Sequence, residues 1–150
     1  MSARYSEPLF VISVAARLVK MHPQTLRKYE REGLIAPSRT SGNLRLYSDS
    51  DIERLRQVKY LVAEPPEGRG LNLAGVQLAL ELTARLRQIR GSLEAETGVA
   101  ENGATPGRLG KACAEQLSQM RRELDGVLAM LGFVDQSEIR ARFGDRTTGD

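Results

Sequence analysis

The chain has 150 residues, of which 41% are hydrophobic and 5% are aromatic, so it can form an aliphatic core and is not a disordered chain. Its single cysteine excludes an intrachain disulfide, and no apolar stretch is long enough to cross a membrane, so we expect a soluble, cytoplasmic protein. The net charge of +3 is unevenly distributed. Residues 1–62 carry 11 Lys and Arg against 6 Asp and Glu, whereas residues 63–150 carry 11 against 13. This basic excess in the first part favours contact with a polyanion there.

The first elements along the chain are a short apolar run and a helix. Residues 1–8 are polar and read as an arm, and the run LFVI at 9–12 indicates core packing or a brief strand. Ser13 is predicted to cap a helix whose apolar residues recur at helical spacing. A tight turn at Lys20 and Met21 follows. Residues 13–32 are therefore predicted to form two short helices joined by a turn, the helix-turn-helix arrangement.

Residues 22–34 (HPQTLRKYEREGL) hold the second helix of this pair. His22 stands at its cap, Pro23 at its first position and Gly33 at its end, while Leu26 faces inward. A short basic helix with hydrogen-bonding side chains near its N-terminus fits the major groove of DNA, although a solvated surface helix has the same composition. The candidate DNA-contacting side chains on this helix are Gln24, Thr25, Arg27, Lys28, Tyr29 and Arg31.

Residues 36–47 are predicted to form a small β-hairpin, called the wing below. Residues 41–43 (SGN) are a turn cluster, and residues 44–47 alternate apolar or aromatic with basic side chains. Arg39 and Arg45 would flank the wing and reach phosphates or the minor groove. An ordinary hairpin with solvated arginines is the alternative, but a wing directly after a helix-turn-helix favours DNA contact.

Two further helices with a loop between them come next. Ser48 is predicted to cap a helix over residues 48–62 that has two acidic residues in its first turn. Residues 63–70 (AEPPEGRG) break the helical pattern and form a loop or hinge. Asn72 then caps a fourth helix that covers residues 72–92. Residues 9–94 together are expected to form one DNA-binding domain.

The remaining chain divides into a linker, a helix and a tail. Residues 95–107 are small and polar and are expected to be a flexible linker, and residues 133–150 form a polar tail. Residues 108–132 form a helix, ended by Gly132, whose apolar residues alternate in spacings of four and three, typical of a coiled coil. A helix that docks on its own domain is the alternative. The predicted coiled-coil positions, called the seam below, are Leu109, Cys113, Leu117, Met120, Leu124, Val127 and Leu131.

These motifs together resemble the MerR family of winged-helix regulators, without gaps over residues 10–62. The resemblance is carried by Ile12-Ser13-Val14-Ala15, Thr25-Leu26-Arg27-Lys28-Tyr29-Glu30, Gly33-Leu34-Ile35 with Pro37, Arg45-x-Tyr47-Ser48, and Asp51-Ile52 with Leu55. Within the family, the chain is most similar to the HspR group of heat-shock repressors, on the segments FVISVAARLVKMHPQTLRKYEREGL and LNLAGVQLALEL.

The resemblance implies a mainly α fold, in which a winged helix-turn-helix domain is followed by a long C-terminal dimerisation helix in an antiparallel coiled coil. It also implies a homodimer that binds an inverted repeat in promoter DNA, represses chaperone genes and takes a DnaK-type chaperone as co-repressor. By position, the recognition helix would contact DNA through Arg27, Lys28 and Tyr29, and the wing through Arg45 and Tyr47.

Other functions are left open or disfavoured by the same residues. One alternative is a MerR-type activator that distorts its promoter when it senses a small ligand, and another is an architectural winged-helix protein of the excisionase kind. Cys113 on the seam and the single His22 do not make a metal site, and we expect no metal and no cofactor. With one histidine, one cysteine and no Gly-rich phosphate loop, the sequence does not predict an enzyme.

Overall fold

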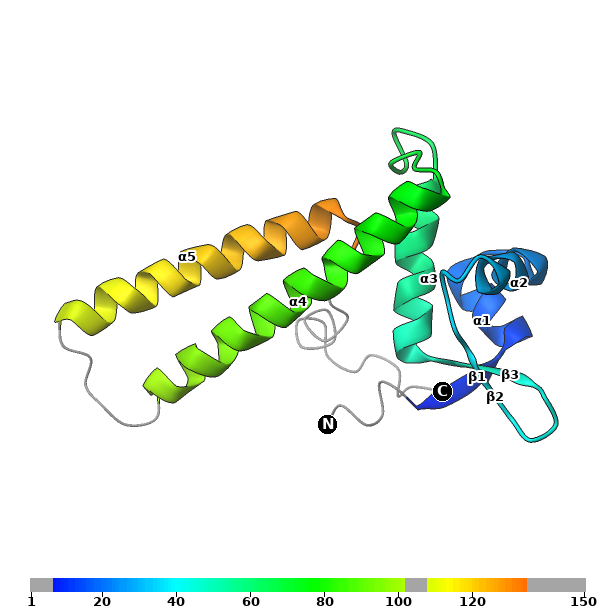
Figure 1. Cartoon of the computed structure of the whole chain (residues 1–150), viewed down its shortest axis with the longest axis horizontal. Helices are drawn as coiled ribbons and strands as arrows, with labels where there is room; N and C mark the ends of the chain where they lie inside the picture. The colour runs from blue at the N-terminus through cyan, green and yellow to red at the C-terminus, as the bar shows by residue number, and fades with distance from the viewer. Residues whose placement is uncertain (1–6, 102–107, 135–150) are drawn as a thin grey trace, which may run out of the picture. The chain divides into compact units, whose positions relative to one another are not determined.

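The computed structural model describes residues 7–101 and 108–134, and these form two compact units (Figure 1). The first is built mainly from residues up to Leu73, and the second spans Ala74–Phe133. Both are mainly helical, and the first also holds a small sheet of three strands, as the sequence predicts for a winged helix-turn-helix. The elements are β1 Pro8–Val11, α1 Ile12–Val19, α2 Pro23–Arg31, β2 Ser38–Arg39, β3 Arg45–Ser48, α3 Asp49–Val62, α4 Leu73–Glu101 and α5 Arg108–Met130.

Helix α1 begins one residue before the predicted cap. Its N-cap is Val11, which makes no side-chain capping bond, so the prediction that Ser13 caps the helix is wrong. The reason is that the brief strand predicted at residues 9–12 is real and leads directly into the helix as β1. The predicted turn at Lys20 is confirmed. Lys20 adopts φ 53° and ψ 52°, a left-handed conformation that usually falls to glycine.

Helix α2 is capped at both ends by the residues that the sequence marks. The Nδ1 atom of His22 accepts a hydrogen bond from the backbone N–H of Gln24 at 3.1 Å, and Pro23 occupies the first turn. At the other end Gly33 has φ +76°. The N–H of Gly33 donates to the carbonyl of Glu30, and the N–H of Leu34 donates to the carbonyl of Tyr29, which is the Schellman pattern. Local hydrogen bonds therefore define where helix α2 begins and where it ends.

The sheet contains the predicted hairpin and one more strand. Strand β3 lies in the middle, with β2 antiparallel on one side and β1 antiparallel on the other. The β2–β3 pairing is short, with Arg39 opposite Arg45 and Ser38 opposite Leu46. The predicted turn at residues 41–43 joins these strands, and Asn43 adopts φ 64° there. The sequence predicts the hairpin but not the pairing of β1 to its other edge.

Helix α3 has a two-way cap at its start and a docked loop at its end. The Ser48 hydroxyl accepts from the Asp51 N–H at 3.1 Å, and the Ser48 N–H donates to the Asp51 carboxylate at 2.9 Å, so the predicted cap is a full capping box. The loop at residues 63–70 folds back on the last turn. The Arg69 N–H donates to the Tyr60 carbonyl and the Gly70 N–H to the carbonyl of the C-cap residue Ala63, and a Cβ on Gly68 would clash with the Tyr60 carbonyl oxygen. The loop is thus a cap for α3, not a hinge.

The core of the first unit is aliphatic with two tyrosines, as the composition predicts. Helix α3 buries one stripe of apolar residues that ends at Leu61, while the next residue, Val62, is exposed. The buried apolar side chains are Ala15, Ala16, Val19, Leu26, Tyr29, Leu34, Ile35, Tyr47, Ile52, Leu55, Val58 and Leu61.

The second unit is a pair of long helices that contact each other. Helix α4 continues to Glu101, so residues 95–101 belong to a helix and not to the predicted linker; residues 102–107 lie outside the described part. Ion pairs join the two helices, between Arg90 and Asp125 at 3.4 Å and between Arg121 and Glu94 at 3.2 Å. The alternative that α5 docks on a helix of its own chain therefore holds for one side of α5.

The packing of α5 on α4 covers some residues of the predicted seam and leaves others exposed. Leu117, Leu124 and Leu131 are half-buried, and the fully buried α5 residue is Leu128, which the seam does not include. Cys113, Met120 and Val127 remain exposed, with Met120 at 51% and Val127 at 44%, and Leu109 lies outside the described side chains. Cys113 is therefore not a core residue of the single chain.

The end of α5 repeats the pattern that ends α2. The Gly132 N–H donates to the Ala129 carbonyl and the Phe133 N–H to the Leu128 carbonyl, so the predicted stop at Gly132 is confirmed. The buried Phe133 ring lies 4.6 Å from the Arg87 guanidinium carbon, a cation–π contact that ties the end of α5 to α4. In the described part of the chain, no helix is long and apolar enough to cross a membrane.

Backbone conformation at the two left-handed helix ends gives a test of the first unit. No atom lies within 4 Å of a Cβ built on Gly33, so Gly33→Ala changes only the backbone preference and should destabilise the protein by about 1–2 kcal/mol. At the equivalent position after α1, Lys20→Gly should stabilise it by about 0.5–1 kcal/mol, because glycine adopts this conformation freely. Denaturant unfolding measures both, and effects of equal sign would contradict the assignment.

Candidate nucleic-acid interface

Helix α2 is amphipathic, and its outer face carries three of the six DNA contacts that are predicted on this helix. Leu26 and Tyr29 are buried at 0% and 8% exposure and fix the inner face. The predicted contacts Gln24, Lys28 and Arg31 recur at spacings of four and three and are exposed, so they share one face of the helix. Thr25 and Arg27 are half-buried at the edges of this face. This outer face is called the α2 face below.

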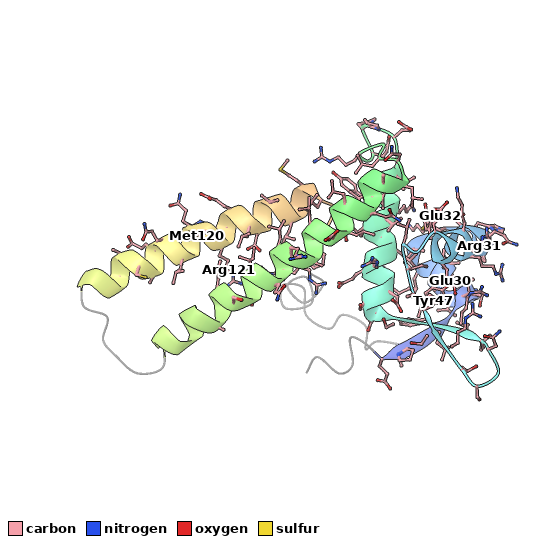
Figure 2. All side chains as sticks on the ribbon, viewed as in Figure 1. Glu30, Arg31, Glu32, Tyr47, Met120 and Arg121 are labelled. Atoms are coloured by element: carbon pink, nitrogen blue, oxygen red, sulfur yellow. The ribbon has the colours of Figure 1, made fainter. Side chains whose placement is uncertain are left out.

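The α2 face carries a net positive charge. Lys28 is paired with Glu32 at 3.9 Å along the helix, but its side chain remains 60% exposed. Such an exposed pair is worth little in water, so the ammonium stays available to a phosphate. Arg31 and Glu32 lie near the C-terminal end of α2 (Figure 2).

A carboxylate joins the wing to α2. Glu30 Oε1 accepts from the NH2 group of Arg39 at 2.8 Å, and Glu30 Oε2 accepts from the Nε of Arg45 at 2.5 Å. Arg39 comes from β2 and Arg45 from β3, so one side chain of α2 holds both strands of the hairpin. This group of three is called the Glu30 bridge. The predictions place both arginines at the interface but do not include Glu30.

The turn of the wing adds a second support to Arg39. Its NH1 group donates to the Asn43 carbonyl and to the Asn43 side-chain oxygen, each at 3.2 Å. Thr40 closes the turn by accepting the Leu44 N–H on its hydroxyl at 3.1 Å. Both terminal nitrogens of Arg39 therefore make hydrogen bonds that hold the wing together.

Tyr47, which the resemblance places among the DNA contacts of the wing, presents no surface in this structure. Its side chain is 0% exposed, and its hydroxyl makes no hydrogen bond within the described residues. Burial, followed by the charge of the nearby Glu30, raises the pKa of the Tyr47 hydroxyl above its ordinary value of 10.0 (Figure 2). Strand β3 contacts helices α1 and α3, and Tyr47 lies on the covered face of the strand, which the alternation of residues 44–47 does not identify.

Tyr29 is a core residue more than a contact. It is 8% exposed, and burial together with the charge of Glu32 raises the pKa of its hydroxyl. Its ring packs inward, so the side chain has little surface to offer to DNA.

Two basic side chains of α3 brace the helix-turn-helix. Arg54 donates its Nε to the carbonyl of Leu34, just after α2, and Lys59 donates its Nζ to the carbonyls of Val19 and Lys20, at the end of α1, at 3.2 Å each. The Lys59 ammonium thus satisfies carbonyls at the end of α1 that have no intrahelical partner, and Arg54 holds the segment that follows α2. No local sequence signal marks them, because the partners lie far away in sequence.

Electrostatics at the Glu30 bridge favour the ionised carboxylate. Partial burial alone would raise the pKa of Glu30, but the hydrogen bonds from Arg45 and Arg39 and their positive charges outweigh it and lower the pKa below 4.5. The bridge therefore exists as a charged triad over the physiological pH range.

The described residues contain no cluster of His, Cys, Asp and Glu suited to a metal ion. His22 uses its Nδ1 as a helix cap, and Cys113 stands exposed on α5.

The model of the MerR helix-turn-helix family of regulatory proteins matches residues 10–83, which cover the α2 face and the wing. A Streptomyces coelicolor protein described as heat shock protein HspR is 42% identical over 114 residues, covering 76% of this chain and 72% of that protein. The chain belongs to the MerR family. It is thus a DNA-binding transcription regulator, in a family of regulators and not of enzymes.

Other relatives match a smaller share of their own length. The transcriptional regulator GlnR of Bacillus anthracis is 38% identical over 77 residues, which are 51% of this chain and 56% of GlnR. The transcriptional repressor CarH of Myxococcus xanthus is 34% identical over 101 residues, 67% of this chain and 29% of CarH. The chain spans about half of GlnR and less than a third of CarH.

The Glu30 bridge predicts an acid-dependent loss of stability. Because the folded-state pKa of Glu30 lies below its unfolded value, the bridge contributes stability above about pH 4.5 and loses it as the pH falls through the folded pKa. Glu30→Gln should therefore cost about 1 kcal/mol near pH 7 and progressively less at lower pH. Urea unfolding of both proteins between pH 7 and pH 3 measures the difference, and a constant difference would show that the charge is not involved.

Proposed function

We propose that this regulator represses chaperone genes of the heat-shock type. The observation that carries the proposal is the similarity to the heat shock protein HspR, which covers 114 residues, more than the part matched by the family model. The similarity thus reaches past the DNA-binding elements that all members share. We further propose that a DnaK-type chaperone is its co-repressor.

The proposed DNA contacts come from the α2 face and the wing. Gln24, Thr25 and Arg27 lie in the first two turns of α2, which suits contacts to base edges in the major groove. The basic side chains Lys28, Arg31 and Arg45 suit phosphates, which position the protein without reading sequence. A helix of nine residues offers few base contacts by itself, so a single copy of this interface would discriminate weakly.

A homodimer would supply the second copy, and α4 and α5 offer the surface for it. On α5 the exposed seam residues Met120 and Val127 follow one another at a heptad spacing. On α4 the large apolar residues Leu78, Leu82 and Ile89 are exposed by 60%, 45% and 50% and share one face. Apolar stripes of this size on a soluble protein favour association. Two chains would then bind the halves of an inverted repeat.

Genome-wide sequencing of DNA bound in cells tests the proposed target. We expect enrichment at promoters of chaperone operons, each with an inverted repeat whose halves are spaced by whole helical turns. Adding a purified DnaK-type chaperone should then raise the affinity for that operator. Enrichment at unrelated promoters, with affinity that responds to a small ligand and not to chaperone, would instead support a ligand-sensing activator.

The dimer proposal is tested by charges on the exposed part of the seam. Met120→Glu with Val127→Glu should weaken self-association by tenfold or more, because each carboxylate would be buried without a partner. Both positions are exposed in the single chain, so the contact of α5 with α4 should persist. Ser118→Glu, at an exposed position outside the seam, is the matched control. Sedimentation equilibrium measures the association, and an unchanged dimer in the double variant would exclude this face.

A further inference from the structure

The two arginines of the Glu30 bridge differ in how many of their N–H groups remain available to a further partner. Arg39 uses one terminal nitrogen on Glu30 and the other on Asn43. Arg45 binds Glu30 only through Nε, and its two terminal nitrogens make no hydrogen bond within the described residues. Its side chain is 27% exposed. Arg45 therefore combines a fixed attachment at Nε with two terminal nitrogens that are both unused by the described residues, whereas each terminal nitrogen of Arg39 already makes a hydrogen bond.

The guanidinium group explains why this attachment matters. It is a rigid plane with five N–H donors, so a bond at Nε fixes the direction of the terminal nitrogens as well. Two such donors match the oxygens of a phosphate. A side chain that is already oriented loses less conformational entropy when it binds. The carboxylate on α2 thus prepares a wing arginine for a phosphate.

We propose that Glu30 is a positioning residue for DNA binding, which orients the terminal nitrogens of Arg45 toward a backbone phosphate while Arg39 braces the wing. The inference depends on DNA binding, which family membership establishes, and is independent of the proposed chaperone genes.

Positioning by Glu30 and simple electrostatics predict opposite changes in DNA affinity when Glu30 is neutralised, so the direction of the change distinguishes them. Glu30 is a negative charge beside a surface that binds a polyanion, so charge alone predicts that its removal strengthens binding. Positioning predicts the reverse, because Arg45 then has to be ordered at the moment of binding. Glu32, on the same helix and paired with Lys28 at 3.9 Å, gives the matched control for the charge effect.

The experiment measures the affinity of the full chain for a mixed-sequence DNA duplex at several salt concentrations. Glu30→Gln should weaken binding about three- to tenfold and make the slope of log K against log salt shallower by about 1, the loss of one phosphate contact. Arg45→Gln should do the same, and the double variant should be no worse than either single one. Glu32→Gln should strengthen binding. Tighter binding by Glu30→Gln would overturn the proposal.

A second variant keeps the proposal testable if Glu30→Gln unfolds the wing. Arg45→Lys preserves the positive charge but has no Nε donor beside a terminal pair, so it cannot bind Glu30 and a phosphate in the same way. We expect the shallower salt slope of Arg45→Gln, with circular dichroism unchanged. A slope equal to that of the unaltered protein would show that charge alone matters at this position. Because the probe carries no operator, neither result depends on which genes are regulated.

Discussion

The charged triad of Glu30, Arg39 and Arg45 is the constraint on which the interface depends. Strand β2 has only two residues, and two residue pairs join it to β3, so the hairpin has little backbone pairing of its own. The carboxylate of α2 binds one arginine from each strand and replaces the missing ladder. The Glu30 bridge therefore fixes the position of the wing relative to α2, so the two parts of the proposed DNA-binding surface are held together.

The local part of this fold is readable from sequence because its signals are satisfied within a few residues. His22 caps a group two residues away, Ser48 and Asp51 cap each other, and Gly33 and Gly132 each end a helix where the chain must turn left-handed. The predicted cap at Ser13 is wrong because a contact between distant segments overrides the local signal. A capping side chain is a preference of the isolated helix, and here the pairing of β1 with β3 brings the chain into α1 earlier.

What the sequence does not reveal depends on which face of an element is covered. In β3 the alternation of residues 44–47 gives two faces, and both carry an apolar residue, so the pattern alone does not tell which one packs inward. In the structure, the face of β3 that holds Arg45 and Tyr47 is turned toward the helices, where Arg45 needs an anion and Tyr47 is buried in the core. Glu30 supplies that anion fifteen residues earlier in the chain. Arg54 and Lys59 are missed likewise, because backbone carbonyls distant in sequence are their partners.

The seam on α5 shows the same limit for association. Apolar residues at spacings of four and three predict that the helix packs against another helix, but they do not identify that helix. In this chain α4 covers part of the apolar face of α5, namely Leu117, Leu124 and Leu128. Met120 and Val127 lie on the part that is left over. If a second chain covers them, each recognition helix acts in a pair, and the second contact forms at the high effective concentration set by the first. A nine-residue helix with modest discrimination then suffices, because the selectivity of two half-sites multiplies where the free energies of binding add.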